Sequence, residues 1–357
     1  MSALVDVVIA VHTPSRPLGR AVRSVLEGNE RHTRLSVVCH DVESDRIAAI
    51  VDPEHRDRVT WIEHQDGLRS ASGPFNAGIA AAKGDFVSIM GSDDTLQPGA
   101  VDSWLRLARR TRAETLVTRL ALGEAGRRVP TPPTRPWLRG AAHVVKDRLS
   151  YRSAPLGLVS TATRERLGLH LAEGLPVGGD VGYATRLWCE TRVAVQHTGP
   201  GYVIGEDAAD RVTYEPRPIE VELAFVLDLV EQPWFTAYPR ATRTSVVTKL
   251  LRIHVFGAVH NRPDPAWWTL VERAALVEVM LRLDAAAPEH ADPLSRADHA
   301  LIAAILSPQT PPEQMIRRAR ARRRHGTPAT LVTRDLRQLA HREAPLRFMG
   351  ASWWARR

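Results

Sequence analysis

Strand-like and helix-like segments alternate over the first hundred residues, and this alternation constrains the fold more than any other feature. VDVVIAV (5–11) is an apolar run typical of a buried strand, and PLGRAVRSVLEG (17–28) has the apolar spacing of an amphipathic helix. The alternation continues with expected strands at 35–40, 58–64 and 86–90 and expected helices at 45–51 and 76–83. This order predicts an α/β fold, with a mostly parallel sheet flanked by helices.

The pattern changes after about residue 216, where the strand-like runs stop. Helix-like segments then follow at 219–232, 245–260, 266–283, 297–306 and 327–341. We therefore expect two domains: an α/β domain over residues 1–215, and an all-α C-terminal domain over residues 216–357 that ends in a basic tail.

The net charge of +8 is concentrated at the C-terminal end. Residues 310–357 carry a net charge of +9, and the rest of the chain carries about −1. A near-neutral first domain argues against nucleic acid as a partner. The arginine run at 317–325 and the closing SWWARR suit an anionic membrane surface. A solvated helix or a contact within a homo-oligomer would explain them equally well.

The sequence contains no segment that resembles a signal peptide or a membrane span. Its two cysteines, Cys39 and Cys189, are too few for a disulfide framework, which favours a reducing compartment. We therefore expect a cytoplasmic location, with the basic tail as a possible peripheral anchor on the inner face of the membrane.

An acidic turn, GSDDTLQPG, follows the expected strand 86–90 and presents Ser92, Asp93 and Asp94. In parallel sheets ligands bind beyond the carboxyl ends of the strands, where His12 and Asp41 are also expected. Adjacent carboxylates there suit a hard cation such as Mg²⁺ or Mn²⁺. The alternative is a surface turn in which Asp and Ser side chains bond to the backbone.

The order of motifs around this turn resembles the family 2 glycosyltransferases of the GT-A (Rossmann-like) fold. An Asn-containing helix of small residues leads through a Lys-Gly pair and a strand to the acidic turn and a proline: Asn76, Gly78, Lys83, Gly84, 86–90, Ser92, Asp93, Asp94 and Pro98. The resemblance covers about residues 4–215. It implies the inverting transfer of a sugar from a nucleotide diphosphate, by default UDP, to a hydroxyl on a glycan or lipid-linked acceptor. Cell-envelope or polysaccharide assembly would be its setting.

The resemblance also implies roles for the donor-binding residues. Val11 and His12 would line the pocket of the nucleotide base, and Asp41 would accept a hydrogen bond from it. Asn76 would lie near the diphosphate or the ribose, although a helix N-cap or a strand-end turn would explain Asn76 and Asp41 structurally. Ser92, Asp93 and Asp94 would contact the nucleotide sugar, with Asp93 as the metal ligand.

Asp180 is the expected general base, because it follows two glycines and precedes an amphipathic helix at the place where the family carries an acidic pair. The structural alternative is a helix N-cap. Arg211 lies where the family has a loop over the diphosphate, and it would either clamp phosphate or belong to a solvated loop.

Three positions depart from the family pattern. Gly91 and Gly179 stand where members carry acids, and Phe75 precedes Asn76 where members often have Arg. Gly91 and Phe75 put strong metal dependence in question. Gly91 and Gly179 motivate a second hypothesis: a degenerate GT-A domain that binds a nucleotide or a partner without turnover. A nucleotidyltransferase would need a phosphate-binding loop near the N-terminus, and HTPSRPLGR is only weakly similar to such a loop.

Overall fold

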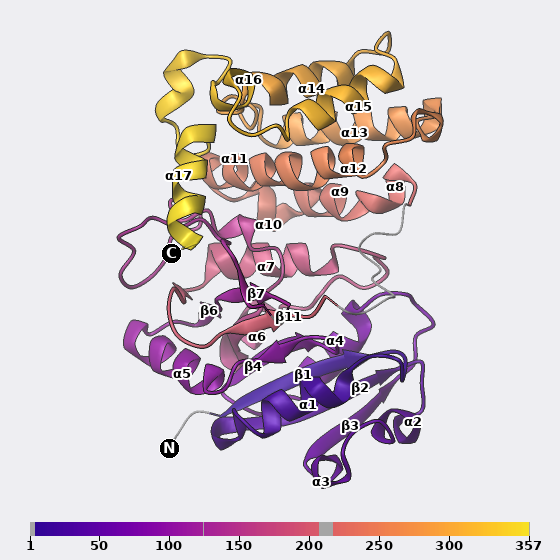
Figure 1. The fold of residues 1–357 in the computed structure, drawn as a ribbon, viewed down its shortest axis with the longest axis vertical. Helices are drawn as coiled ribbons and strands as arrows, with labels where there is room; N and C mark the ends of the chain where they lie inside the picture. Colours follow the sequence, from indigo (N-terminus) through magenta and orange to yellow (C-terminus); the bar gives the residue numbers. More distant parts are fainter. Residues whose placement is uncertain (1–3, 124, 207–216, 357) are drawn as a thin grey trace.

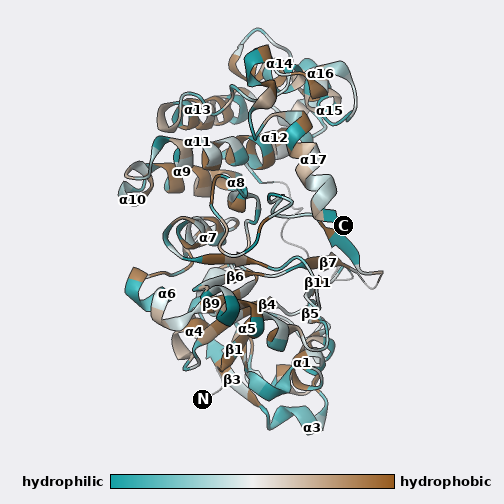
Figure 2. Ribbon diagram, turned by 90° about the vertical axis from the view of Figure 1, so that its left-hand side faces the viewer, coloured by the Kyte–Doolittle hydropathy of each residue, from teal (hydrophilic) through white to brown (hydrophobic). Residues whose placement is uncertain are grey.

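The computed structural model describes residues 4–123, 125–206 and 217–356. Figure 1 shows two layers, with the β-sheets and their helices below and a stack of helices above. Figure 2 shows the same division after a quarter turn. The boundary expected at residue 215 falls in the segment 207–216, which lies outside the described residues.

The larger sheet has the strand order β10-β6-β9-β4-β1-β2-β3. Strands β4, β1, β2 and β3 run parallel to one another, as do β10 and β6, whereas β9 is antiparallel to both of its neighbours. The mostly parallel sheet expected from the sequence is therefore confirmed. Its strands are β1 (Val5–Val11), β2 (Thr33–His40), β3 (Val59–His64), β4 (Phe86–Gly91), β6 (Thr115–Val117), β9 (Gly157–Ser160) and β10 (Val193–Val195).

A second, four-stranded sheet has the order β5-β11-β7-β8. Its strands are β5 (Thr95–Leu96), β11 (Tyr202–Ile204), β7 (Leu120–Leu122) and β8 (Arg127–Val129). This sheet was not predicted from the sequence, because two- and three-residue strands carry too little periodicity to detect. It matters for function because β5 follows the acidic turn directly.

Helices cover both faces of the larger sheet. Side chains of β1 alternate between two apolar cores: Val7 packs in the core that contains α1 and α5, and Val8 packs in the core that contains α4 and α7. The helices of this part are α1 (Leu18–Leu26), α2 (Ser44–Ala48), α3 (Pro53–Arg56), α4 (Ser72–Ala81), α5 (Ala100–Thr111), α6 (Thr161–Leu167) and α7 (Gly179–Glu190).

Buried Asp6 explains the Lys-Gly pair of the motif. Its carboxylate accepts two hydrogen bonds from the guanidinium of Arg34, at 2.7 and 2.8 Å, and one each from the backbone N–H groups of Lys83 and Gly84, both at 2.6 Å. A Cβ atom at Gly84 would lie 2.6 Å from the carbonyl oxygen of Leu4. The turn before β4 thus needs glycine for close approach to β1.

The C-terminal region is helical, as expected. Its helices are α8 (Ile219–Glu222), α9 (Ala224–Glu231), α10 (Pro233–Thr236), α11 (Arg240–Lys249), α12 (Phe256–His260), α13 (Leu270–Ala286), α14 (Arg296–Leu306), α15 (Pro312–Ala321), α16 (Pro328–Leu331) and α17 (Pro345–Arg356), with a π-helical turn (Leu250–Val255) between α11 and α12. None of the described helices is long and apolar enough to span a bilayer.

The prediction of a single helix over residues 327–341 is wrong. The chain forms α16 and a separate 3-10 turn (Leu336–Ala340) instead. Between them the backbone is extended: Thr333 forms a β-bridge with Ser295, and the carbonyl oxygen of Val332 accepts a hydrogen bond from the N–H of Arg296 at 2.9 Å. This pairing with the start of α14 replaces the helical hydrogen bonds that the apolar spacing suggested.

Candidate active site

The carboxyl ends of β1, β2 and β4 lie at one edge of the larger sheet. Ala10 pairs with Gly91 and Val11 with Cys39, so His12, Asp41 and Ser92 all follow aligned strand ends. This is the arrangement that the sequence predicts. The side chain of Val11 is buried in the core below this edge, so only its backbone is available to a nucleotide base.

Asp41 lies at the edge in a left-handed backbone conformation, with φ of 52°, and its side chain is 40% exposed. Its Oδ1 accepts hydrogen bonds from the backbone N–H groups of Asp66 and Gly67, at 3.2 and 3.3 Å. The turn that follows β3 is thereby fixed against the end of β2. Asp41 is a strand-end turn residue, and it also presents carboxylate surface to solvent.

Two histidines beside Asp41 were not predicted from the sequence. His40 and His64 end β2 and β3 in register, and both contact the carboxylate of Asp66, at 2.7 and 3.0 Å. The hydrogen bond from His40 is the main cause that lowers the pKa of Asp66 to about 2. A histidine at the end of each of two neighbouring strands is the signal that could have revealed this cluster.

The acidic turn is held from below by the second sheet. The hydroxyl of Tyr202, in β11, donates a hydrogen bond to Oδ2 of Asp94 and accepts one from the backbone N–H of Gly91 at 3.0 Å. The other carboxylate oxygen of Asp94, Oδ1, accepts a hydrogen bond from the backbone N–H of Gly205 at 2.9 Å. Burial raises the pKa of Asp94. Both of its oxygens accept hydrogen bonds that hold the turn, so Asp94 helps to fix the position of Asp93; contact of Asp94 with the nucleotide sugar stays a prediction.

Gly91 has a steric explanation. A Cβ atom there would lie 2.5 Å from Oδ2 of Asp94 and 3.2 Å from Oδ1 of Asp93. An acid at this position would collide with the carboxylates on which the turn depends. The departure from the family pattern is therefore built into the geometry of this turn.

Asp93 lies at the tip of the turn among arginines from α1 and the loop before it. Its Oδ2 is 3.2 Å from the Nη1 of Arg16, and its carbonyl oxygen accepts a hydrogen bond from the Nη2 of Arg20 at 2.8 Å. The side chain retains 15% exposure. Asp93 fits a divalent cation as a single carboxylate ligand, because Mg²⁺-type ions usually take one or two carboxylates and complete their shell with phosphate oxygens and water.

Among the described residues, two sets of side chains bring three ligand atoms close enough for a metal ion: Glu27 with Glu54 and His55, and His40 with Asp41 and Asp66. Neither set includes Asp93. Within the described part of the chain, a cation at the acidic turn would have Asp93 as its carboxylate ligand, and diphosphate oxygens and water would supply further ligands.

Asn76 lies in the second turn of α4, so the N-cap alternative is wrong. Its amide exchanges two hydrogen bonds with the backbone of Leu171, both at 2.9 Å, and donates a third to Glu173 at 2.7 Å. These bonds tie α4 to the segment that leads into α7. A cavity of about 380 Å³ opens beside Asn76, and Arg164, His170 and Glu173 contribute its charged and polar lining.

Asp180 lies in the first turn of α7, where Gly178, with φ of 75°, is the N-cap residue. The N-cap alternative for Asp180 is therefore wrong. The carbonyl oxygen of Gly179 accepts a hydrogen bond from the N–H of Ala172 at 2.9 Å, and a Cβ atom at Gly179 would lie 2.3 Å from the Ser72 Oγ. The start of α7 is thus held against the start of α4, and no acidic side chain has room at position 179.

The helical region forms the other wall around Asp180. Gly178 lies against the ring of Phe225 in α9, and a Cβ atom at this glycine would lie 2.3 Å from Cγ of the ring. Phe225 in turn makes an edge-on contact with His254, with 4.8 Å between ring centroids. Burial raises the pKa of Asp180, and the positive charge of Lys249 opposes this shift.

Lys249 ends α11 and is 2% exposed. Its ammonium lies 2.8 Å from Nε2 of His254 in the π-helical turn. Burial lowers the pKa of Lys249 to about 8 and holds that of His254 well below its usual value, so the imidazole is the neutral acceptor of the pair. Lys249 was not predicted as a site residue, because nothing in a helical stretch marks one lysine as the neighbour of a distant carboxylate.

Arg211, which the sequence places in a loop over the diphosphate, lies outside the described residues.

Comparison with known proteins finds similarity to glycosyltransferases in sequence and in fold. The family described as "Glycosyl transferase family 2" matches residues 6–161. The chain is 30% identical over 118 residues to the succinoglycan biosynthesis protein ExoO of Rhizobium meliloti (strain 1021), covering 32% of this chain and 33% of ExoO. It is 24% identical over 118 residues to the glycosyltransferase GlyG of Streptococcus pneumoniae serotype 4, covering 33% of this chain and 39% of GlyG. The aligned part thus spans about a third of each of these relatives.

The fold resembles crystal structures of S. aureus TarS over nearly the whole chain. TarS 1–349 matches with a TM-score of 0.65 at 16% identity, covering 91% of this chain and 92% of that one. The TarS 1–349 complex with UDP-GlcNAc matches with a TM-score of 0.67 at 14% identity, covering 89% of both chains. Residues 6–161 are therefore similar to a family 2 glycosyltransferase domain, and the chain has the GT-A fold followed by a helical C-terminal region.

Proposed function

We propose that the protein is an inverting glycosyltransferase that moves a sugar from a nucleotide diphosphate, by default a UDP-sugar, to a hydroxyl acceptor in polysaccharide assembly. The observation that carries the proposal is the position of Asp180, whose helix start is fixed against the start of α4, which lies beside His64 and Asp66 at the carboxyl end of β3. The TarS complexes with UDP-GlcNAc and with UDP support the choice of donor, and the name of ExoO supports a role in polysaccharide assembly.

In this mechanism the carboxylate of Asp180 removes the proton from the acceptor hydroxyl. The acceptor oxygen attacks the anomeric carbon, and the bond from that carbon to the diphosphate oxygen breaks, so the electron pair leaves with the nucleotide. The raised pKa of Asp180 makes it a stronger base than an exposed aspartate. General-base assistance of this kind contributes about 10²–10⁴-fold to the rate.

The acidic turn would serve the leaving group. A Mg²⁺ or Mn²⁺ ion held by Asp93 and the donor would neutralise charge on the departing diphosphate. Arg16, already beside Asp93, is placed to share in binding the diphosphate oxygens. His12 and Asp41 would receive the base at the same sheet edge, while Asn76 would act indirectly by holding the segment before α7.

Membrane contact through the arginine run 317–325 stays a prediction. Arg322 in this run forms an ion pair with Asp298 at 2.7 Å, so it belongs to the fold of the helical region. Arg317, Arg318, Arg320, Arg323 and Arg324 are exposed and are the members available to an anionic surface.

The test is UDP-GlcNAc hydrolysis with Mn²⁺, in which water serves as the acceptor. We expect Asp180→Asn to lose at least about 10²-fold in turnover and to keep UDP binding in a thermal-shift titration. Asp228→Asn, an exposed position on α9, is the matched control and should retain wild-type turnover.

The second candidate is a domain that binds a nucleotide without turnover, which the glycines at positions 91 and 179 favour. UDP binding without hydrolysis or transfer of any tested UDP-sugar, in wild type as in Asp180→Asn, would support this candidate and refute the transferase.

A further inference from the structure

A second cavity, of about 270 Å³, lies between the 134–137 loop and the C-terminal helix α17. Five of the side chains that line it are cationic: Arg135, Lys146, Arg148, Arg342 and Arg347. No acidic side chain is among the described residues that line it. It shares no residue with the candidate active site, so its chemistry is a separate question.

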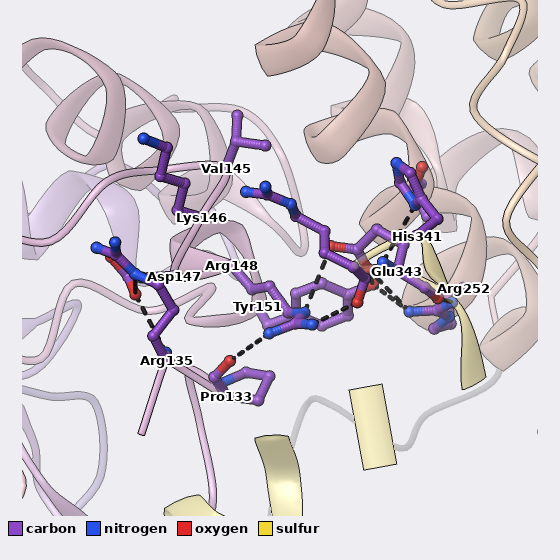
Figure 3. A network of polar contacts seen from close by, with 12 residues as sticks. Pro133, Arg135, Val145, Lys146, Asp147, Arg148, Tyr151, Arg252, His341 and Glu343 are labelled. Atoms are coloured by element: carbon purple, nitrogen blue, oxygen red, sulfur yellow. Dashed lines mark hydrogen bonds and ion pairs between the residues drawn. The ribbon is translucent and has the colours of Figure 1, made fainter. Parts of the chain in front are cut away.

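The acidic groups nearest to the cavity are already engaged (Figure 3). Asp147 accepts two hydrogen bonds from the guanidinium of Arg135, both at 2.7 Å. Glu343 accepts hydrogen bonds from Tyr151 at 2.8 Å and from Arg252 at 3.1 Å. Within the described part of the chain, no carboxylate lies within ion-pair distance of Lys146, Arg342 or Arg347, so the cavity carries a positive charge.

Two cavity-lining arginines contain buried N–H groups without an acceptor in the described structure. Arg148 is 4% exposed and donates to the carbonyl oxygens of Pro133, at 2.9 Å, and of Arg342. Its Nε makes no hydrogen bond, but it lies 3.7 Å from Oε1 of Glu343 in an ion pair. The Nη1 of Arg342 is also buried and makes none. Leaving the Nη1 donor of Arg342 unpaired costs about 1–3 kcal/mol, so a ligand that brings oxygen acceptors would be favoured here.

The positive field also acts on a neighbouring side chain. Burial lowers the pKa of His341, and the charges of Arg342, Arg148 and Arg347 lower it further, against the opposing effect of Glu343. A field that disfavours a proton on His341 favours an anion in the same place.

The volume of the cavity and the residue at its opening indicate a ligand larger than a simple inorganic ion. A volume of about 270 Å³ corresponds to about nine water molecules at their share of the liquid. Trp137, which is 69% exposed, lines the opening and offers an aromatic face to the carbon skeleton of a ligand.

We propose that this cavity binds a phosphate ester, with the phosphate on the cluster of arginines and lysine and the organic part against Trp137. Phosphate supplies several oxygen acceptors at once, and guanidinium groups bind it through paired hydrogen bonds. A soluble sugar phosphate and an anionic lipid headgroup share this chemistry, and the experiment separates them.

The test compares the full-length wild type with the double variant Lys146→Ala/Arg347→Ala, in which both positions are exposed and their truncation spares the core. Arg337→Ala, an exposed arginine outside the cavity, controls for the loss of a charge. Calorimetric titration with glucose 1-phosphate, with glucose as the uncharged reference, measures the soluble source. Co-sedimentation with phosphatidylglycerol vesicles, with phosphatidylcholine vesicles as reference, measures the lipid source.

We expect glucose 1-phosphate or phosphatidylglycerol to bind the wild type and Arg337→Ala, and to bind the double variant about tenfold or more weakly, because two charge-assisted contacts are lost. Selective loss with glucose 1-phosphate identifies a soluble phosphate ester, and selective loss with vesicles alone identifies a lipid phosphate. No binding of either probe, or equal binding by the double variant and Arg337→Ala, would overturn the proposal. None of these measurements depends on sugar transfer.

Discussion

The ammonium of Lys249 lies 2.8 Å from Nε2 of His254, in the helical region, while its charge acts on the carboxylate of Asp180 at the start of α7. The proposed base therefore owes part of its environment to a residue outside the family 2 match. Because Lys249 is buried, its charge is screened little by water or salt.

Lys249→Met tests this relationship by removing the charge while nearly keeping the side-chain volume. Lys249 favours the ionised form of Asp180, so its loss should raise the pKa of Asp180 further above the usual range. The base acts when it is deprotonated, so the acid limb of kcat/KM for donor hydrolysis should move to higher pH. Lys83→Met, at an exposed site, should leave the profile in place. A drop in rate with an unmoved acid limb would show that Lys249 acts only in packing.

Asp93→Asn tests the acidic turn. The exchange keeps the side-chain shape and removes the carboxylate at the tip of the turn, so the Mn²⁺ concentration needed for half-maximal donor hydrolysis should rise by about tenfold or more. Asp45→Asn, exposed on α2, should not change it. An Asp93→Asn enzyme with lower activity and an unchanged response to Mn²⁺ would assign Asp93 to its ion pair with Arg16 instead of to a metal.

Gly179→Ala tests why the family acid is absent. The added Cβ would lie 2.3 Å from the Ser72 Oγ and 2.5 Å from the carbonyl oxygen of Ala172, so we expect a loss of about 1–3 kcal/mol in the free energy of unfolding. Gly182→Ala in the same helix meets nothing within 4 Å and should stabilise by up to about 1 kcal/mol. Equal stability of the two variants in urea denaturation would contradict the packing argument.

Glu343→Ala tests the contact between the two regions. Glu343 is 2% exposed and lies between Arg148 and Arg252, so its removal leaves two buried cations without their counter-charge. We expect a loss of about 3–5 kcal/mol in the free energy of unfolding. Glu278→Ala breaks an exposed ion pair with Arg282 and should cost less than about 1 kcal/mol. A similar small cost at both positions would mean that water reaches the Glu343 cluster.

Strands β1, β2 and β4 were predictable from the sequence because most of their residues are buried and appear as apolar runs, whereas the edge strand β3 was predictable from its β-branched and aromatic residues. The expected strand 5–11 matches β1, and the others agree within about two residues. The second sheet was not predictable, because its strands have only two or three residues and β11 pairs with the distant segments β5 and β7. The extended stretch around Thr333 was missed for the same reason.

The same distinction between local and long-range features applies to the residues of the candidate site. The residues at strand ends, His12, Asp41 and Ser92, follow from topology alone, since parallel strands bring their carboxyl ends to one edge. The partners of Asp94 and Asp180 do not, because Tyr202 and Lys249 lie far away in the sequence and in elements of different type. From the sequence, the glycines at positions 91 and 179 suggested a loss of function. In the structure, neighbouring atoms occupy the space that a side chain would need at either position.

The contact between Gly178 and Phe225 bears on how such chains can diversify. A chimera that joined residues 1–206 to the helices of another protein would inherit the strand ends and the acidic turn intact. It would recover a working base only if the new helices brought both a ring against position 178 and a buried cation near position 180. Replacing the helical region alone should therefore rarely yield an active enzyme with a new acceptor specificity. Combined substitutions in α7 and in the helices that contact it should succeed more often.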